Sequence, residues 1–375
     1  MAKSPYDQAP ASNTVVIRPS SQSRAMGWVI TISAIFLVVL CTLINVGLVA
    51  LETGPSNLIV GGILAILPVP IYVALALWLD RFEAEPPRLL LAAFFWGAAI
   101  ATFFASIFNT ISYIVIASMF GEELGDVGAA VLSAPLVEEV AKGLALFIFY
   151  LWKKDEFDGV VDGIVYATMV GLGFAMTENI AYYARAAQES ADVTAVTFAL
   201  RGLMGPYAHP LFTSMTGIGL GFARQSANRN VKIFAPLGGL LLAMLLHATW
   251  NLTSSLGVAF FLAYLLVMAP VFGGVLVLIY FSLRREGNLI RQQLLRDMQR
   301  GRISPAEFEA LVSTSGRMRA SWRALLRGGF NAWRAQGQLH QLESELAFHR
   351  WRVSQGIHPA DEREDVLDRA GVCGG

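Results

Sequence analysis

The chain has 375 residues, of which 55% are hydrophobic and only 15% are charged. Its mean hydropathy of +0.54 is too high for an ordinary soluble domain. Basic and acidic residues both number 28, so the zero net charge does not indicate a nucleic-acid binder. The two cysteines, Cys41 and Cys373, are too few for a disulfide framework or a thiolate metal cluster. Most of the chain is therefore expected to lie in lipid.

Residues 1–26 are rich in Ser, Pro, Gln and Ala and are expected to form a disordered cytosolic N-terminus. Eight apolar runs follow, each near or above the ~20 residues that a membrane-spanning helix needs. The runs cover residues 27–51, 58–79, 89–120, 127–152, 159–184, 197–223, 233–254 and 258–283. We therefore predict an all-α polytopic membrane protein with an eight-helix membrane domain at 27–283.

Lysine and arginine gather in alternate loops, namely before the first run and after the second, fourth, sixth and eighth runs. The other loops hold almost none, with Arg185 as the exception. Because cytoplasmic loops of membrane proteins are enriched in Lys and Arg, we expect both termini to be cytoplasmic in a multi-pass protein of the cell membrane.

Residues 284–375 contain 15 arginines, 11 acidic residues and no lysine, with apolar residues at helical spacing. Ser304 before Pro305 is typical of a helix start. This predicts a short, Arg-rich cytosolic helical tail. Its helices could lie on anionic lipid or pack on each other, and the sequence leaves both possibilities open.

Ionisable side chains occur inside four consecutive apolar runs, although each costs roughly 2.5 to 3.5 kcal/mol in hydrocarbon on insertion scales. They are Glu138, Glu139 and Lys142 in the fourth run, Glu178 in the fifth, His209 in the sixth, and His247 in the seventh, where Asn251 follows. A residue of this kind in a membrane helix is a candidate for a functional site.

Helical spacing places Glu138 and Lys142 on one face of a helix, and likewise His247 and Asn251. Glu138 lies about 17 Å from the external start of its run, at 1.5 Å per residue, and His247 lies roughly 21 Å from its cytosolic start. These depths predict that the polar residues meet between the bilayer midplane and the outer leaflet.

Such a cluster suits hydrolysis inside the membrane. A carboxylate in a low-dielectric pocket can take a proton from water, while His and Asn can donate to the oxyanion of a tetrahedral intermediate. A Ser or Cys nucleophile fits less well, because Cys41 lies in the first run and no G-x-S-x-G occurs. A transporter or proton-coupled carrier using the buried carboxylates, and a non-catalytic membrane scaffold, are the alternatives.

Four motifs in order, EEVAK at 138–142, FAMTE at 174–178, His209 and HATWN at 247–251, resemble the PrsW family of intramembrane proteases, which is related to the type II CAAX prenyl proteases. The likeness runs from about residue 127 to 254. It implies that 27–283 is a protease domain that cuts a single-span membrane protein near its extracytoplasmic face. An anti-sigma factor cleaved in regulated proteolysis of the site-1 type would be such a substrate.

Transferred by matching motif, the resemblance makes Glu138 the water-activating base, Glu139 its partner, and His247 with Asn251 the oxyanion donors or, in a metal version, ligands. Glu178 stands where the CAAX branch has His, so the missing imidazole could come from His209, or the site could work differently.

The family is commonly described as a metalloprotease, and Zn²⁺ would accept His209, His247 and Glu138 with one open position. The sequence has no H-E-x-x-H motif, however, and a metal-free glutamate mechanism remains equally open. The expected partners are the single-span substrate and the lipid bilayer, with no nucleic acid.

Overall fold

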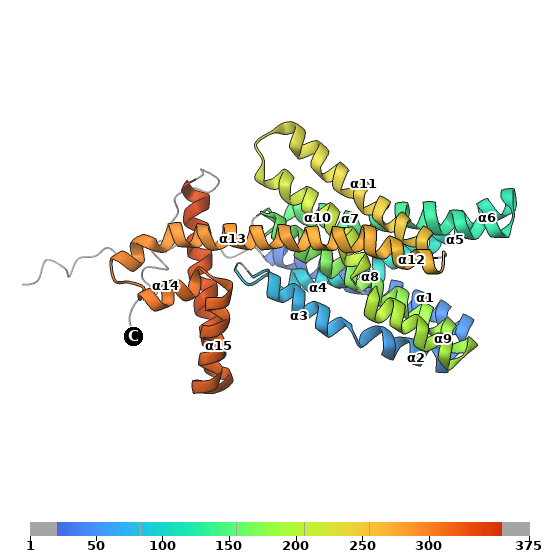
Figure 1. Cartoon of the computed structure of the whole chain (residues 1–375), viewed down its shortest axis with the longest axis horizontal. Helices are drawn as coiled ribbons and strands as arrows, with labels where there is room; N and C mark the ends of the chain where they lie inside the picture. The colour runs from blue at the N-terminus through green and yellow to red at the C-terminus, as the bar shows by residue number, and fades with distance from the viewer. Residues whose placement is uncertain (1–20, 83, 155, 206, 255, 355–375) are drawn as a thin grey trace, which may run out of the picture.

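The computed structural model describes residues 21–354 apart from residues 83, 155, 206 and 255. Within this part of the chain, all regular secondary structure is helical (Figure 1). The N-terminal segment predicted to be disordered lies outside the described residues up to residue 20, and the chain is already helical from Ser21.

The α-helices are α1 (Ser21–Thr53), α2 (Pro55–Ile66), α3 (Val69–Leu79), α4 (Pro87–Phe95), α5 (Thr102–Phe120), α6 (Glu122–Gly128), α7 (Ala134–Trp152), α8 (Val160–Glu189), α9 (Ala191–Phe198), α10 (Ala208–Gln225), α11 (Arg229–Ser254), α12 (Val258–Ala263), α13 (Ala269–Gln299), α14 (Pro305–Leu311) and α15 (Thr314–Ser354). Short π-helical segments, η1 (Trp96–Ala101), η2 (Ala129–Ser133), η3 (Ala199–Met204) and η4 (Tyr264–Met268), join several of them.

Six helices of the described chain are long and apolar enough to cross a membrane, which confirms the prediction of an all-α polytopic membrane protein. They are Trp28–Thr53, Pro55–Leu79, Pro87–Phe120, Val160–Glu189, Arg229–Ser254 and Val258–Gln299. The remaining two expected spans, α6 to α7 and α9 to α10, carry the charged and polar residues that lower their hydropathy. The total of eight spans therefore stays a prediction.

The sixth expected span is not one continuous helix. Segment η3 ends at Met204, and α10 begins at Ala208. The prediction of an uninterrupted helix over 197–223 was wrong at this point, because the sequence there is Gly205-Pro206, and a proline removes a helical N–H and disfavours the α conformation before it. The break places His209 in the first turn of α10.

Helix α8 forms the centre of the bundle, with 83% of its most apolar window buried, compared with 11% for α1. Glycines allow neighbouring helices to touch it backbone to backbone. A Cβ on Gly171 would lie 2.6 Å from the Pro210 nitrogen, and one on Gly163 would lie 2.2 Å from the Gly217 carbonyl oxygen. This close approach of α8 and α10 brings the segment around Glu178 next to His209.

Helix α13 passes without a break through residue 283, where the sequence predicted the end of the membrane domain. The tail continues with α14, where Ser304 and Glu307 form a capping box that confirms the predicted helix start. Helix α15 is interrupted at Gly329, with φ 68° and ψ −162°, and we call the two arms at 314–328 and 330–354 the tail hairpin. Figure 1 shows α15 crossing the end of the bundle transversely.

Candidate active site

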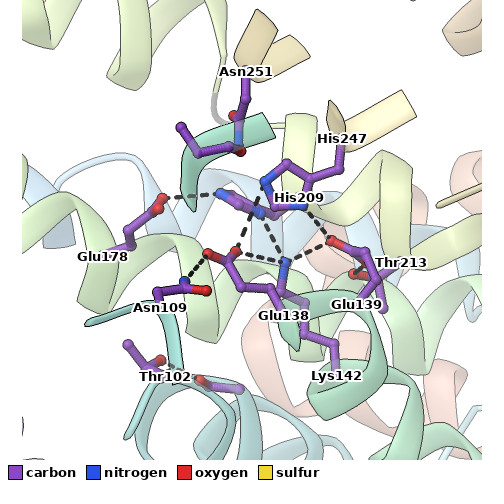
Figure 2. A network of polar contacts seen from close by, with 12 residues as sticks. Thr102, Asn109, Glu138, Glu139, Lys142, Glu178, His209, Thr213, His247 and Asn251 are labelled. Atoms are coloured by element: carbon purple, nitrogen blue, oxygen red, sulfur yellow. Dashed lines mark hydrogen bonds and ion pairs between the residues drawn. The ribbon is translucent and has the colours of Figure 1, made fainter. Parts of the chain in front are cut away.

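The ionisable residues singled out in the sequence converge from four helices, α7, α8, α10 and α11 (Figure 2). Glu139 and Lys142 are fully buried, and Glu138, His209 and His247 are each less than 10% exposed. The agreement in depth that the helix lengths predicted is therefore present in the folded chain. The roles of these residues remain proposals.

Lys142 lies at the centre of the cluster. Its Nζ is 2.7 Å from Glu139 Oε1, 2.9 Å from His209 Nδ1 and 3.5 Å from Glu138 Oε2. The ammonium also lies 4.0 Å from the centre of the Phe174 ring, a cation–π distance. One positive charge thus lies between two adjacent buried carboxylates and offsets part of the energetic cost of ionising both.

Each imidazole in the cluster is held by a carboxylate on one ring nitrogen. His247 Nδ1 lies 2.9 Å from Glu139 Oε1, and His209 Nε2 lies 3.0 Å from Glu178 Oε2. The other nitrogen of His247, Nε2, lies 3.8 Å from Glu138 Oε2. A carboxylate behind an imidazole fixes its tautomer and orientation, as the outer partners of metal-binding histidines do.

Glu138 is the acid whose surroundings leave an acceptor open. Its Oε1 accepts a hydrogen bond from Asn109 Nδ2 at 3.1 Å, while its Oε2 is buried and has no hydrogen-bond partner among the described residues. Asn109 is in turn held by Ser133 Oγ, which donates to the amide oxygen at 3.2 Å. An open buried acceptor of this kind favours a ligand, because leaving it unsatisfied has a cost of a few kcal/mol.

Sequence reasoning did not single out three residues that contact the cluster. Asn109 of α5 bonds Glu138, Thr213 of α10 donates to Glu139 Oε2 at 3.2 Å, and Arg201 of η3 forms an ion pair with Glu178. An available signal for Arg201 was its charge at the edge of an apolar run. Asn and Thr are common in membrane helices as ordinary hydrogen-bonding residues, so their sequence positions carried no comparable signal.

Asn251 stands apart from the hydrogen-bonded cluster. Its amide donates to the Ala130 carbonyl at 2.8 Å, one helical turn beyond His247 (Figure 2). It does, however, line the same cavity as Glu138 and His209. The structure therefore brings six of the seven predicted residues into direct contact and leaves Asn251 at the cavity wall.

This cavity has a volume of about 590 Å³ and is lined by residues that include Glu138, Glu178, His209, Trp250 and Asn251. Its wall also includes Asp126 and Ser254, which lie near helix ends that the loop charges predict to be external. We call it the active-site cavity. Its size suits a short peptide segment, because ligand pockets commonly measure about 300 to 1,000 Å³.

Glu138, His209 and His247 could hold a metal ion, because one ligand atom of each lies within 4.8 Å of the others. Two features of the chain fit such an ion. The open Oε2 of Glu138 supplies an unsatisfied acceptor, and Glu139 and Glu178 stand behind the two imidazoles. For His209 to bind, either Lys142 must release Nδ1 or Glu178 must release Nε2.

The chain is similar to known proteins over the region that contains this cluster. A family model described as "PrsW family intramembrane metalloprotease" matches residues 85–275, which include all four site helices. Protease PrsW of Geobacillus kaustophilus is 32% identical over 172 residues, covering 46% of this chain and 69% of that protein. Protease PrsW of Bacillus subtilis is also 32% identical over 172 residues, covering 46% and 72%.

A further relative, Protease PrsW of Clostridioides difficile, is 27% identical over 189 residues, covering 50% of this chain and 76% of that protein. No solved structure matches the chain. The matched region, the extent of these alignments and the clustered acids and imidazoles lead to one conclusion: this chain belongs to the PrsW family of intramembrane metalloproteases.

Proposed function

We propose that this protease hydrolyses a peptide bond in a single-span membrane protein near its extracytoplasmic face, with Glu138 as the base that activates water. The observation that carries the proposal is the buried carboxylate of Glu138, which lines the active-site cavity and whose Oε2 has no hydrogen-bond partner among the described residues. The predicted external position of the cavity supports cleavage near that face. A substrate of the anti-sigma-factor type, which the family resemblance implies, is an integral single-span protein that would fit.

The neighbours of Glu138 have distinct tasks in this mechanism. Asn109 fixes one carboxylate oxygen by its hydrogen bond, which leaves the other oxygen, near Lys142 and His247, to accept the proton of the attacking water. His247, oriented by Glu139, and His209, oriented by Glu178, bind the metal or donate to the developing oxyanion. Asn251 lines the same cavity outside the hydrogen-bonded cluster, where its amide can bind a carbonyl of the substrate peptide.

For the metal-dependent form of the reaction we propose zinc, with Glu138, His209 and His247 as its ligands, whereas Glu138 acts as the base only in the metal-free form. Two imidazoles and a carboxylate with an open fourth position are the ligand set that Zn²⁺ takes in several hydrolases. When bound, such an ion polarises the scissile carbonyl and makes its bound water more acidic. Three carboxylates, of Glu138, Glu139 and Glu178, and two cations, Lys142 and Arg201, leave one net negative charge with neutral imidazoles, which favours a divalent cation.

The metal proposal is tested by the metal content of purified protein. We expect one zinc per chain in the wild type and loss of the metal in His247→Ala. The helical content of the variant, measured by circular dichroism, should equal that of the wild type. A wild-type protein that cleaves substrate without bound metal and in the presence of chelator would instead support the metal-free glutamate mechanism.

The protease mechanism is tested by Glu138→Gln, which keeps the shape of the side chain but removes the base. In liposomes with single-span candidate substrates, we expect cleavage to fall by about 10²- to 10⁴-fold, the usual contribution of general base catalysis. Glu122→Gln, on exposed α6, is the matched control and should cleave at the wild-type rate. Wild-type cleavage by Glu138→Gln would overturn the assignment.

A further inference from the structure

A second cavity of about 390 Å³ lies between α1, α5 and α8, beside the active-site cavity. The two cavities share the lining residues Asn109, Thr110, Glu138, Glu178 and Tyr182. Glu138 therefore lines both cavities. We call the second cavity the lateral groove.

The wall of the lateral groove is unusually polar for a position within membrane helices. Its polar lining residues outside the shared set are Asn45, Glu52, Thr102, Ser106, Thr177 and Arg185. The hydroxyls donate to main-chain carbonyls, for example Ser106 Oγ to Thr102 at 2.8 Å and Thr177 Oγ1 to Ala98 at 2.7 Å. Each hydroxyl oxygen thus keeps lone pairs that can accept a hydrogen bond from another chain.

An unwound peptide needs such partners inside a membrane. A peptide bond can be cut only where the substrate helix is opened, and every freed N–H and C=O in lipid costs several kcal/mol if unsatisfied. Non-helical backbone is therefore tolerated at membrane depth only where protein groups or water satisfy it. The acceptors of the lateral groove meet this need directly beside Glu138.

The lipid side of the groove is closed by α1, which is the least buried wall. Asn45 Nδ2 of α1 lies 3.5 Å from the Ala99 carbonyl of η1. Glu52 of α1 forms a bidentate ion pair with Arg185 of α8, at 2.6 and 2.9 Å, with both side chains about half exposed, and its carbonyl accepts from Gln188 at 3.0 Å. Exposed ion pairs contribute little stability, commonly about 0–1 kcal/mol. These contacts join α1 to η1 and α8, and none of them joins α1 to α5.

We propose that the lateral groove binds an unwound segment of the substrate's membrane-spanning helix, which enters sideways from lipid between α1 and α5. This rests on the proposed function, because the groove leads to Glu138. The active-site cavity then holds the part of the substrate that emerges toward water. A short soluble peptide can reach Glu138 through the active-site cavity without using the groove.

The test compares two substrates with the same cleavage sequence, a single-span protein and a short soluble peptide. Ser106→Trp fills the groove from an exposed position of α5, and Ile107→Trp on the same helix is the control. We expect Ser106→Trp to lower kcat/KM for the spanning substrate by about ten-fold or more while peptide cleavage changes less than about two-fold. If Ser106→Trp and the wild type cleave the spanning substrate equally, the lateral groove does not bind the substrate and the proposal is overturned.

A cross-linking arm separates the groove from the protease mechanism. A photoreactive residue at position 106 in the Glu138→Gln background should capture the spanning substrate even without turnover, and one at position 107 should not. Capture at 106 without any cleavage by the wild type would refute the proposed function but support the groove. Cleavage by the wild type with no capture at 106 would refute the groove alone.

The tail hairpin carries an independent surface feature. Met318, Trp322 and Leu326 follow each other at four-residue spacing on its first arm, and Trp322 and Leu326 are 58% and 80% exposed. Phe330, 65% exposed, continues the apolar row beyond the turn and stacks on Trp333 with ring centres 5.3 Å apart. Four large apolar side chains in water would be a liability unless something covers them.

The charges of this hairpin select the partner. Residues 314–342 contain no acidic residue, and the exposed cations among them are Arg319, Arg323, Arg327 and Arg334. An amphipathic helix with exposed aromatic residues and arginines is the pattern that binds anionic lipid surfaces, at about 1 kcal/mol for each basic residue near the surface.

The geometry turns the apolar row toward the bilayer. The other side of the first arm, with Ala320, Arg323, Ala324 and Arg327, lines a cavity shared with α14, so Arg319 and Arg334 are the exposed cations outside that cavity. Figure 1 shows α14 on the side of α15 remote from the membrane helices. Arg317 at the base of the hairpin donates to the Arg81 carbonyl at 2.7 Å, which fixes the hairpin at the end of α3.

We infer that the tail hairpin binds an anionic lipid surface beside the end of α3, with Trp322, Leu326 and Phe330 inserted at the interface. The tail helices also pack on one another through Phe308, Leu311 and Phe348, so the sequence's two possibilities apply to different faces of the tail, and the exposed apolar row is the face we assign to lipid. The inference is independent of the catalytic reaction.

The test uses full-length protein in vesicles, with a spin label at Leu326→Cys in a Cys41→Ala, Cys373→Ser background. With 30% anionic lipid, we expect the label to be accessible to oxygen but shielded from a water-soluble nickel reagent, whereas a label at exposed Gln338→Cys stays accessible to nickel. Arg319→Gln with Arg334→Gln should restore nickel access at position 326. Access of nickel to the label in protein with all its arginines would overturn the inference. Shielding from both reagents that increases with protein concentration would also overturn it, because it would indicate contact between protein copies.

Discussion

Two buried cations, Lys142 in the membrane domain and Arg317 in the tail, have similar neighbours but different partners. Both are less than 5% exposed. Lys142 bonds functional side chains, Glu139 and His209. Arg317 also lies near His340 and Glu343, but its own hydrogen bonds go mainly to the protein backbone.

Arg317 Nε donates to the Leu311 carbonyl at 2.9 Å, Nη1 donates to the Arg81 carbonyl at 2.7 Å, and Nη2 bonds Ser344 Oγ. A planar guanidinium with three fixed bonds to backbone and hydroxyl groups joins chain segments. The Lys142 ammonium instead lies among carboxylates and imidazoles, where its positive charge stabilises the ionised form of the carboxylates. Buried charge alone therefore does not identify a site, whereas the kind of partner does.

The family comparison draws the same line. Lys142 lies within the matched residues 85–275, and Arg317 lies beyond them. The four predictions that follow test this contrast between a reactive cluster and a docking contact.

Lys142→Met should have the largest effect on stability. Removing the cation leaves the carboxylates of Glu138 and Glu139 without their partner in a dry interior, which costs about 3–5 kcal/mol. Cleavage should be lost as well. Denaturation in detergent, followed by circular dichroism, measures the effect, with lipid-facing Leu144→Met as the control. Wild-type stability of Lys142→Met would mean that the cluster does not depend on this charge.

Arg317→Met should release the tail and leave the reaction unchanged. The carbonyls of Leu311 and Arg81 lose their donor, so docking of the tail should weaken by about 2–3 kcal/mol. Limited proteolysis should then cut the tail faster, while cleavage of a soluble peptide keeps its wild-type rate. Exposed Arg300→Met, outside the tail hairpin, is the control. Loss of peptide cleavage would show that the tail supports the catalytic cluster.

Sequence predicted the cluster well because charged residues in apolar runs are rare and helical geometry limits where they can meet. The spacing of Glu138 and Lys142 gave a real ion pair at 3.5 Å. Depth reasoning brought Glu178, His209 and His247 together, but it could not resolve a difference of one helical turn, so Asn251 was expected in the network and lies outside it.

Other features of the fold depend on contacts between distant segments. The lateral groove needs α1 beside α5 and α8, and no local pattern specifies that neighbourhood. The exposed row at Trp322 and the docked Arg317 lie on the same helix, so periodicity alone could not tell which face of the tail packs and which faces outward. The break before Ala208 was readable from Gly205-Pro206 and was missed.

Glu343→Gln should make the tail less sensitive to pH. Burial raises the pKa of Glu343 to about 7, with Glu307 acting in the same direction and Arg317 opposing. Because the folded pKa exceeds the unfolded value, Glu343 costs stability as the pH rises from about 4.5 through about 7. The variant should therefore stabilise tail docking at pH 8 by about 1–2 kcal/mol and have little effect at pH 5.

Limited proteolysis of the tail at the two pH values measures this difference. Burial also lowers the pKa of His340 to about 4, which weakens docking toward acid, but it does so equally in both proteins and cancels in the comparison. Exposed Glu345→Gln is the control. An equal gain at pH 5 and pH 8 would show that the effect of Glu343→Gln is not the titration of this carboxyl.

The smallest predicted effect separates a hydroxyl of the cluster from one beside it. Thr213 Oγ1 donates to Glu139 Oε2 at 3.2 Å, whereas Thr216 Oγ1 on the same helix is buried without a hydrogen-bond partner among the described residues. Valine has nearly the same shape as threonine, so Thr213→Val should cost about 1 kcal/mol and slow cleavage several-fold. Thr216→Val should be neutral or slightly stabilising, because it removes a polar atom that has nothing to bond. Denaturation and cleavage of both variants in one lipid measure the contrast, and equal costs would mean that Thr213 supports packing and not the charge of Glu139.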